Sequence, residues 1–333
     1  MRSAADDRAG GYRRPARRRP GLKGRRSPHT NAYIPAAHLF APFTGEDQMR
    51  GWVVILVVVC VALAAIAGGV VVENETAAVT GEPDQGEPAL YGDVLAYQEL
   101  DNETFDIMLL DLTTGEVRRI TGDADDSMYP SLYEDRLVWE DYRGGSADIY
   151  LCNLTTGDEV RITNGSGEEL DPAVWGDRIV WAENRSGNFD LFVHNIATGE
   201  TARITDHPAD QREPALWGDV VVFADNRYDD WDIFLYDLST GEEREVCIIP
   251  GAQGSPAMHG DLVVWTDTRG EVKGIYGCTL SGGTGVPILT GPVDRHAPAV
   301  RDDTLAWHDE RSGSQDIYLG EMVEGDGAGP AGG

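Results

Sequence analysis

Acidic side chains gather in a set of loops along this 333-residue chain, and their oxygens could bind a cation or a polar ligand. Hard cations such as calcium prefer clustered carboxylate oxygens. The stretch Asp123-x-Asp125-x-Ser127 lacks the glycine and the distal glutamate of a calcium-binding loop. The pattern therefore assigns no metal site and no cofactor, with calcium as the one cation it could attract. The candidate binding residues in these variable loops are Asp123, Asp125, Asp126, Glu168, Asp171, Asp210, Glu213, Asp294 and His296.

A second charged pattern recurs as an acid, an arginine two residues later and an aspartate five residues after the arginine. A functional interpretation is a charged crown that binds a ligand. A structural interpretation is an arginine held between two carboxylates, which fixes a loop. A single reaction needs an asymmetric arrangement, whereas repeats duplicate their folding devices, so the structural role is favoured. The residues are Asp141, Arg143, Asp148, Glu183, Arg185, Asp190, Asp225, Arg227, Asp232, Asp309, Arg311 and Asp316.

No residue is assigned to catalysis. The chain has no G-x-S-x-G nucleophile motif and no zinc-site spacing of His, Cys and Asp. Two carboxylates could serve a glycosidase, but the chain after residue 72 holds 53 acids, so a pair of acids alone carries no information. That segment holds 16 basic residues, and its negative charge would repel nucleic acid and anionic lipid.

These charges lie in a 42-residue repeat, whose units start near Pro88, Pro130, Pro172, Pro214, Pro256 and Pro298. Each unit holds short apolar runs rich in β-branched and aromatic residues, separated by turns that contain glycine, and shows no helical 3.6-residue spacing. Runs such as Ile179-Val180-Trp181 are apolar at consecutive positions, so each sheet must be covered on both faces. The pattern predicts an all-β fold, a six-bladed β-propeller of four-stranded blades.

The last unit lacks a fourth apolar run, which predicts how the ring closes. Residues 75–81 precede the first unit, and Ala78-Val79-Thr80-Gly81 resembles Arg119-Ile120-Thr121-Gly122. We expect residues 75–81 to complete the last blade and remove its exposed edge. This strand would run from the face of the tight turns toward the face of the variable loops. Residues 73–320 then form the propeller, and residues 321–333 are expected to be a disordered tail.

The unit P-A-x-x-G-D-x-I/V-V-W-x-D/E-x-R-x-G-x-x-D-I-Y/F, followed by D-L-x-T-G-E and I-T, resembles the TolB-type propeller repeat. In particular it is similar to the version found in exported surface proteins of archaea and bacteria. The resemblance covers residues 75–320 and implies a six-bladed propeller with mixed-chain closure. Proteins of this kind are mostly binding or scaffold modules, so the resemblance implies that role.

The N-terminal part predicts export. Residues 51–72 carry no charge and are long enough to span a bilayer. Residues 1–50 hold 11 Lys and Arg against 4 Asp and Glu, which places this basic, disordered segment in the cytoplasm and the propeller outside. In the alternative, a signal peptide begins at Met49, and residues 1–48 reflect a mis-annotated start. The protein is thus membrane-anchored or secreted. Candidate glycosylation sites are Asn74, Asn102, Asn153, Asn164 and Asn184.

Two functions follow as expectations. The first is a non-enzymatic, surface-exposed binding, adhesion or scaffold module, a monomeric propeller whose partner is a protein, a glycan or a cell-envelope polymer. The alternative is a secreted carbohydrate-active or other hydrolytic propeller enzyme. A polar pocket at one end of the central channel, with two or three unrepeated acids and a histidine, would favour the enzyme. A uniform crown of arginine–aspartate pairs would favour the module.

Overall fold

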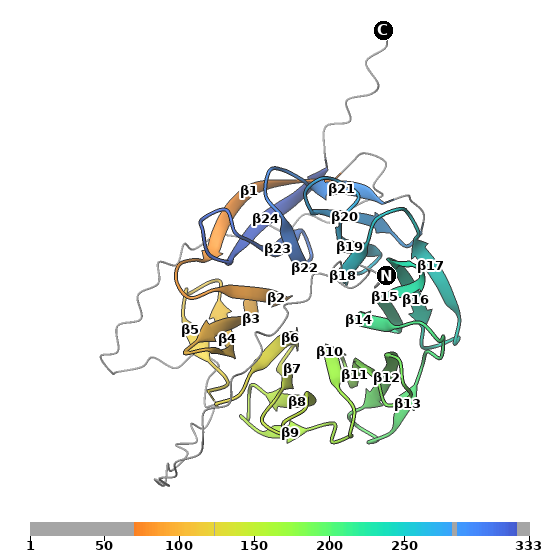
Figure 1. The fold of residues 1–333 in the computed structure, drawn as a ribbon. Helices are drawn as coiled ribbons and strands as arrows, with labels where there is room; N and C mark the ends of the chain where they lie inside the picture. Colours follow the sequence, from red (N-terminus) through yellow and green to blue (C-terminus); the bar gives the residue numbers. More distant parts are fainter. Residues whose placement is uncertain (1–69, 123, 282–284, 325–333) are drawn as a thin grey trace, which may run out of the picture.

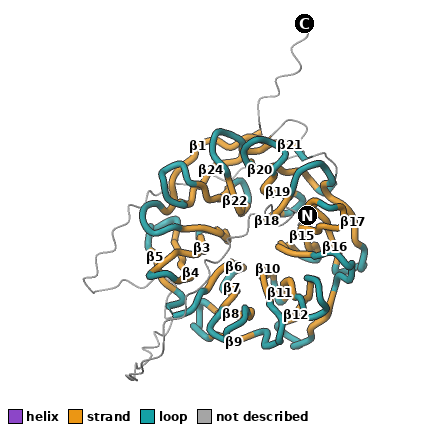
Figure 2. The backbone as a smooth tube through the Cα atoms, viewed as in Figure 1, coloured by secondary structure: helices purple, strands orange, loops and turns teal. Residues whose placement is uncertain are grey.

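The computed structural model describes residues 70–122, 124–281 and 285–324, which form six four-stranded antiparallel sheets. Figure 1 shows the sheets arranged as blades around a central axis, and Figure 2 shows that strands and loops make up this part of the chain. The predicted all-β six-bladed propeller is confirmed. Within the described ranges, no helix of bilayer-spanning length and hydropathy is found. Most of the predicted membrane segment, residues 51–69, lies outside them.

The first four blades follow the chain in order. Blade 1 comprises β2 (Gln85–Tyr91), β3 (Val94–Asp101), β4 (Thr104–Asp111) and β5 (Val117–Arg119). Blade 2 comprises β6 (Ser127–Tyr133), β7 (Arg136–Asp141), β8 (Asp148–Asn153) and β9 (Glu159–Arg161). Blade 3 comprises β10 (Glu169–Trp175), β11 (Arg178–Glu183), β12 (Asp190–Asn195) and β13 (Thr201–Arg203). Blade 4 comprises β14 (Gln211–Trp217), β15 (Val220–Tyr228), β16 (Asp230–Asp237) and β17 (Glu243–Cys247).

The last blade contains strands from both ends of the described chain. Blade 5 comprises β18 (Gln253–His259), β19 (Leu262–Asp267), β20 (Gly274–Thr279) and β21 (Val286–Leu289). Blade 6 comprises β22 (Arg295–Arg301), β23 (Thr304–Asp309), β24 (Asp316–Glu324) and, outermost, β1 (Val70–Val79). Figure 1 shows β1 beside β24, so the ring is sealed by a strand that precedes the first blade.

The closing strand starts earlier than predicted, and the strand that it pairs with ends later. β1 starts at Val70, so residues 70–72 belong to a strand and not to the apolar membrane segment. Its partner β24 runs to Glu324, so residues 321–324 belong to the blade and not to the tail. The reason is burial, because Val70 and Met322 are each 2% exposed and lie in one core cluster. Residues 325–333 lie outside the described residues.

Large aromatic residues on the second strand of each blade form the core between blades. Trp139, Trp181, Trp265 and Trp307 are at most 1% exposed. Trp139 packs with Ile107 of the preceding blade in one cluster. Consecutive apolar residues on a strand therefore serve two interfaces, one on each face of the blade, as the sequence pattern requires.

Candidate functional site at the mouth of the central channel

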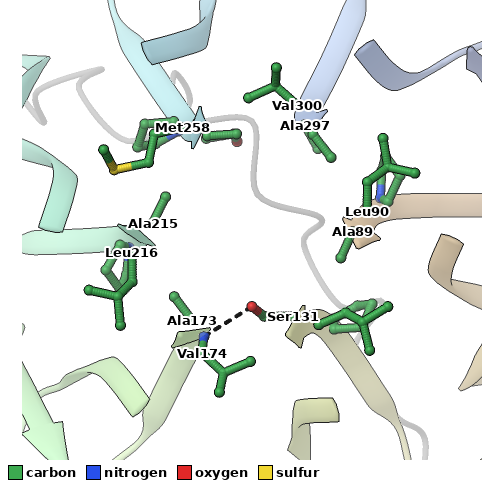
Figure 3. Close-up of a pocket in the computed structure, with 18 of the residues that line it drawn as sticks. Ala89, Leu90, Ser131, Ala173, Val174, Ala215, Leu216, Met258, Ala297 and Val300 are labelled. Atoms are coloured by element: carbon green, nitrogen blue, oxygen red, sulfur yellow. Dashed lines mark hydrogen bonds between the residues drawn. The ribbon is translucent and has the colours of Figure 1, made fainter. Parts of the chain in front are cut away.

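The innermost strands of the six blades, β2, β6, β10, β14, β18 and β22, line a cavity of about 210 Å³ on the propeller axis. Small side chains form much of its wall, among them Ala89, Ala173 and Ala215 in Figure 3. The figure also shows the hydrogen bond that the Val174 amide donates to Ser131 Oγ across two blades, at 3.1 Å. These small side chains leave room for a ligand between the larger residues that also line the channel, such as Tyr129 and Met258.

Because successive strands of a blade run in opposite directions, the propeller has two different faces. The turns between first and second strands and between third and fourth strands lie on one face, called here the turn face. The loops between second and third strands and those between blades lie on the other, called here the variable-loop face. Because β1 is antiparallel to β24, with Val70 opposite Glu324, it runs from the turn face to the variable-loop face as predicted.

A ring of aromatic side chains narrows the channel at the turn face. Ring centroids are 5.0 Å apart for Tyr91 and Tyr133 and 3.9 Å apart for Trp175 and Trp217. The Arg301 guanidinium lies 4.5 Å from the centroid of Tyr91 and 5.2 Å from that of Trp217, which belong to opposite blades. Arg301 therefore crosses the axis, and cation–π contacts hold it there. The full ring is Tyr91, Tyr133, Trp175, Trp217, His259 and Arg301.

Each innermost strand contains a β-bulge on the side of the variable-loop face, and one residue of the bulge has a positive φ. In β2, residues 87 and 88 stand opposite the single residue Tyr97, and Glu87 has a φ of 50°. The same position has φ between 45° and 55° in every blade, although none of the six residues is glycine. Positive φ costs a non-glycine residue on the order of 1 kcal/mol or more. The residues are Glu87, Tyr129, Asp171, Glu213, Ser255 and Ala297, and all line the channel.

A side chain from the preceding blade supports most of these strained residues. The Tyr129 amide donates to Gln98 Oε1 at 3.1 Å, and the Asp171 amide donates to Glu140 Oε1 at 2.6 Å. The Glu87 amide donates to His308 Nδ1 at 3.3 Å. Gln98, Glu140 and His308 occupy the same repeat position, so this is a shared device that joins neighbouring blades.

Two blades have alanine at that supporting position. In these blades the channel carboxylates accept the hydrogen bond from the amide of the next bulge. Ala182 and Ala224 cannot accept a hydrogen bond through their side chains. Instead, the Glu213 amide donates to Asp171 Oδ2 at 3.2 Å, and the Ser255 amide donates to Glu213 Oε2 at 2.5 Å. Asp171 and Glu213 thus help to hold the bulges of the blades that follow them. Among the described residues, no amide of a neighbouring blade donates to the Glu87 side chain.

The carboxylates at the mouth have raised pKa values. Burial, together with the charges of Glu213 and Asp171, raises the pKa of Glu87 to about 8. Burial and Asp171 raise the pKa of Glu213, although Arg212 opposes them. Arg212 Nε donates to Asp171 Oδ2 at 3.1 Å. Burial acts to lower the pKa of Arg212, but Asp171 and the two glutamates beside it outweigh that effect and raise it. The mouth therefore holds more carboxylates than cations.

A smaller pocket of about 50 Å³ adjoins the mouth between blades 4, 5 and 6, and shares Glu213 and Ser255 with the channel. It is also lined by Thr266, Lys273 and the predicted His296. His296 stacks on His308 with ring centroids 5.2 Å apart. Burial and Lys273 lower the pKa of His296 to about 4, and burial and His296 lower that of His308 to about 3. Both imidazoles are therefore neutral at neutral pH.

Three of the predicted variable-loop acids join neighbouring blades through hydrogen bonds from backbone amides. Asp126 Oδ1 accepts the Phe105 amide at 3.2 Å, Asp210 Oδ1 the Phe189 amide at 2.9 Å, and Asp294 Oδ1 the Lys273 amide at 2.8 Å. In each case the amide belongs to the preceding blade. Of the rest, Asp125 and Glu168 lie half-buried on this face, and Asp123 lies outside the described residues.

Asp171, Glu213 and His296 are therefore the predicted binding residues that the structure brings to the channel mouth and its side pocket. The sequence analysis missed Glu87, Tyr129, Glu140 and Arg212 there. Within the described ranges, no group of three or more His, Cys, Asp or Glu side chains is arranged to hold a metal ion.

The predicted repeat charges form a recurrent structural device. In blade 2, Asp141 is 1% exposed and accepts hydrogen bonds from Trp139 Nε1 at 3.0 Å and Arg143 Nε at 2.7 Å. The Arg143 guanidinium lies 4.3 Å from the ring centroid of Tyr150. Equivalent acid–arginine pairs are Glu183–Arg185, Asp225–Arg227, Asp267–Arg269 and Asp309–Arg311.

The second carboxylate of the pattern has a different partner from the one expected. Asp148 binds Arg161 of β9 at 2.7 Å, and Arg143 binds Glu159 of β9 at 2.7 Å. Asp190 likewise binds Arg203 at 2.7 Å. The arginine is therefore not held between the two loop acids, because the fourth strand supplies a separate partner to each of them. Asp232 of blade 4 and Asp316 of blade 6 form no such ion pair with an arginine within the described residues, since Glu245 and the β1 strand stand where that arginine would be.

The asparagine residues of the glycosylation triplets differ in their surroundings. Asn102 and Asn164 are exposed, as is Asn74, whose Nδ2 donates to Glu321 at 3.1 Å. Asn153 Oδ1 accepts two amides of its own turn, and Asn184 Oδ1 accepts the Glu168 amide. Although Asn102 is exposed, its Nδ2 donates to Asp101 Oδ1 at 2.7 Å.

No protein-family model matches this chain, and no curated protein matches it. Among solved structures, TolB from Acinetobacter baumannii has a TM-score of 0.55 and 15% identity over 70% of this chain and 66% of its own. A chain described as TolB from Agrobacterium tumefaciens has a TM-score of 0.56 and 16% identity over 74% and 92%. An oligogalacturonate lyase in complex with manganese has a TM-score of 0.51 and 13% identity over 83% and 99%.

These similarities define the class of fold. With its six four-stranded blades, the chain has the six-bladed β-propeller fold and is similar in fold to these TolB structures, as the repeat predicts. At these identities the comparison concerns the fold alone, since one fold carries many functions.

Proposed function

We propose that this chain is an exported binding module that presents the variable-loop face, with the channel mouth at its centre, to a protein partner. One observation carries the proposal. A single repeat position has the same strained backbone in all six blades, yet it holds Glu, Tyr, Asp, Glu, Ser and Ala instead of glycine. Strained backbone that carries diverse side chains into a cavity is typical of binding sites.

The orientation of the closing strand supports this choice of face. β1 enters the propeller from the turn face, so the preceding chain leaves from there. Residues 51–69 are uncharged and apolar, and residues 1–50 are basic. A membrane anchor in that segment would hold the turn face toward the bilayer and direct the channel mouth outward.

The test compares two double variants of the full-length protein for binding to envelope proteins of the producing organism. Glu87→Gln with Glu213→Gln, at the channel mouth, is expected to reduce binding at least tenfold. Glu116→Gln with Glu200→Gln makes the same chemical change at exposed turn-face positions and is expected to leave binding unchanged. Equal binding by both variants would show that the channel mouth is not the binding surface. Alanine changes at Asp126 or Asp210 are less suitable, because these residues connect blades.

A second candidate function is hydrolysis or elimination of a polysaccharide at the same mouth. The raised pKa of Glu87, about 8, keeps its carboxyl group protonated at neutral pH, which suits a general acid. The mouth also has the unrepeated acids and nearby histidine that we expect of the enzyme, while the crown of acid–arginine pairs fits the module. An assay on neutral polysaccharides and oligogalacturonides should then show turnover that Glu87→Gln lowers at least a hundredfold. If the wild type shows no turnover, the enzymatic function is excluded and only the binding function remains.

A further inference from the structure

The channel mouth has carboxylates without a matching cation. Glu87 on β2, Asp171 on β10 and Glu213 on β14 line the same cavity. Arg212 forms an ion pair with Asp171, at 3.1 Å. Among the described residues, no ion pair involves Glu87 or Glu213. Since the charges of Glu213 and Asp171 act to raise the pKa of Glu87, a positive group placed between these carboxylates would be stabilised.

An independent observation lies in the side pocket next to Glu213. Thr266 is 9% exposed, and its Oγ1 has no hydrogen-bond partner within the described part of the chain. Its repeat equivalents Gln98 and Glu140 reach the channel residue of the next blade, but threonine is shorter. A buried hydroxyl without a partner is costly, so a ligand that hydrogen-bonds to it gains affinity.

We propose that the channel mouth binds a guanidinium or ammonium group at the end of an alkyl chain, as on an arginine or lysine that a protein partner inserts from the variable-loop face. This inference rests on the proposed function and names the chemistry of the partner. Carboxylates accept charge-assisted hydrogen bonds from such groups, and a guanidinium can bridge two of them. The side chain would enter head first, with its stem between the variable loops.

Two nearby cations do not fill this place. Arg301 lies at the opposite end of the channel, where it contacts the rings of Tyr91 and Trp217. Lys273 lines the side pocket with His296, on the loop side of Glu213. The incoming cation is therefore expected beside Glu213, which lines both the channel, with Glu87 and Asp171, and the side pocket, with Thr266.

Binding of such a cation should depend on pH. Glu87 is mostly protonated below pH 8, and a neighbouring positive charge lowers its pKa, so binding releases a proton. Affinity therefore rises as the pH increases toward 8 and becomes constant above it. The other charged or titratable groups around Glu87 are Tyr129 on β6, Glu140 on β7, Asp171 on β10, Arg212 and Glu213 on β14, and His308 on β23.

The experiment measures calorimetric binding of Nα-acetyl-arginine amide to the full-length protein between pH 6 and 9. Nα-acetyl-citrulline amide, which has nearly the same shape and no charge, is the matched ligand. We expect arginine amide to bind at least tenfold more tightly than citrulline amide at pH 9, and at least tenfold more tightly at pH 9 than at pH 6. Glu87→Gln with Glu213→Gln should weaken binding at least tenfold, and Thr266→Val about threefold.

The control is Glu116→Gln with Glu200→Gln on the turn face, which should bind like the wild type. Equal affinity for both ligands, or saturation by calcium chloride with no arginine binding, would overturn the inference. If arginine amide does not bind but the channel-mouth variant still loses its envelope partner, the proposed function stands and the cationic ligand is wrong. If arginine amide does not bind and the channel-mouth variant binds its envelope partner like the wild type, both the proposed function and the cationic ligand are wrong. Unchanged melting of the variants shows that each result reports binding and not folding.

Discussion

Deletion of residues 70–79 from the full-length chain is expected to abolish the closed monomeric propeller. β1 contributes Val70 and Ala78, which are 2% and 3% exposed, and it pairs with β24 from Val70 to Val79 apart from two bulges. Loss of this burial removes about 5 kcal/mol or more, a large part of the stability of an ordinary domain. The free edge of β24 would then pair with other chains. Light scattering and thermal melting should show a large fall in melting temperature and self-association.

A synthetic peptide of residues 70–81 provides the control for that deletion. Added in excess, it is expected to restore the monomer and most of the melting temperature, because it can pair with the free edge of β24 and fill the clusters that Val70 and Ala78 occupy. The same peptide with Ala78→Asp should fail, since it places a charge in a buried cluster. A deletion variant that stays monomeric and melts like the wild type would show that ring closure does not depend on β1.

The blade number and the closing strand could be predicted because the repeat fixes both. The 42-residue period and the missing fourth run of the last unit leave one strand to be supplied from elsewhere. The start of that strand was wrong by several residues. Residues 70–72 are all valine, and a valine run satisfies a membrane segment and a β-strand equally well. Contact with Met322, far away in sequence, decides between them.

The channel mouth could be predicted only in part. The variation of their loops predicts Asp171 and Glu213 but does not predict Glu87, which holds the same repeat position. The signal was the residue before each repeated proline, which changes type from unit to unit. Its positive φ could not be seen, because glycine, the usual marker of that conformation, is absent there.

Asp126, Asp210 and Asp294 have a structural role that the variability of their loops does not predict. The loops around them differ, which favours a binding role in the sequence analysis. Yet they are spaced by multiples of 42, and Asp84 belongs to the same series. Asp84 Oδ1 accepts the Gln315 amide at 3.1 Å, as its equivalents accept amides in other blades. A residue type that recurs inside a variable loop thus indicates a structural role for that position.

The second large effect is expected at the buried acid–arginine pairs. Arg143→Met should destabilise the protein by about 3–5 kcal/mol, because it leaves the buried Asp141 carboxylate with no cation. In the wild type, burial acts to raise the pKa of Asp141, but Arg143 and Trp139 outweigh it and hold the pKa below its ordinary value. Without the arginine, burial raises that pKa. Denaturant unfolding at pH 7 should therefore show the whole expected decrease in the free energy of unfolding.

The pH dependence separates this mechanism from simple loss of packing. In Arg143→Met the folded-state pKa of Asp141 lies above the unfolded value, so the folded variant takes up a proton as the pH falls. Its deficit against the wild type should shrink on acidification toward pH 4, and adding Asp141→Asn should recover most of the loss at pH 7. The control Arg136→Met breaks an exposed ion pair with Asp177 and should cost less than about 1 kcal/mol. A deficit independent of pH, and not relieved by Asp141→Asn, would mean that Arg143 stabilises the blade through its contact with Tyr150 and not through its charge.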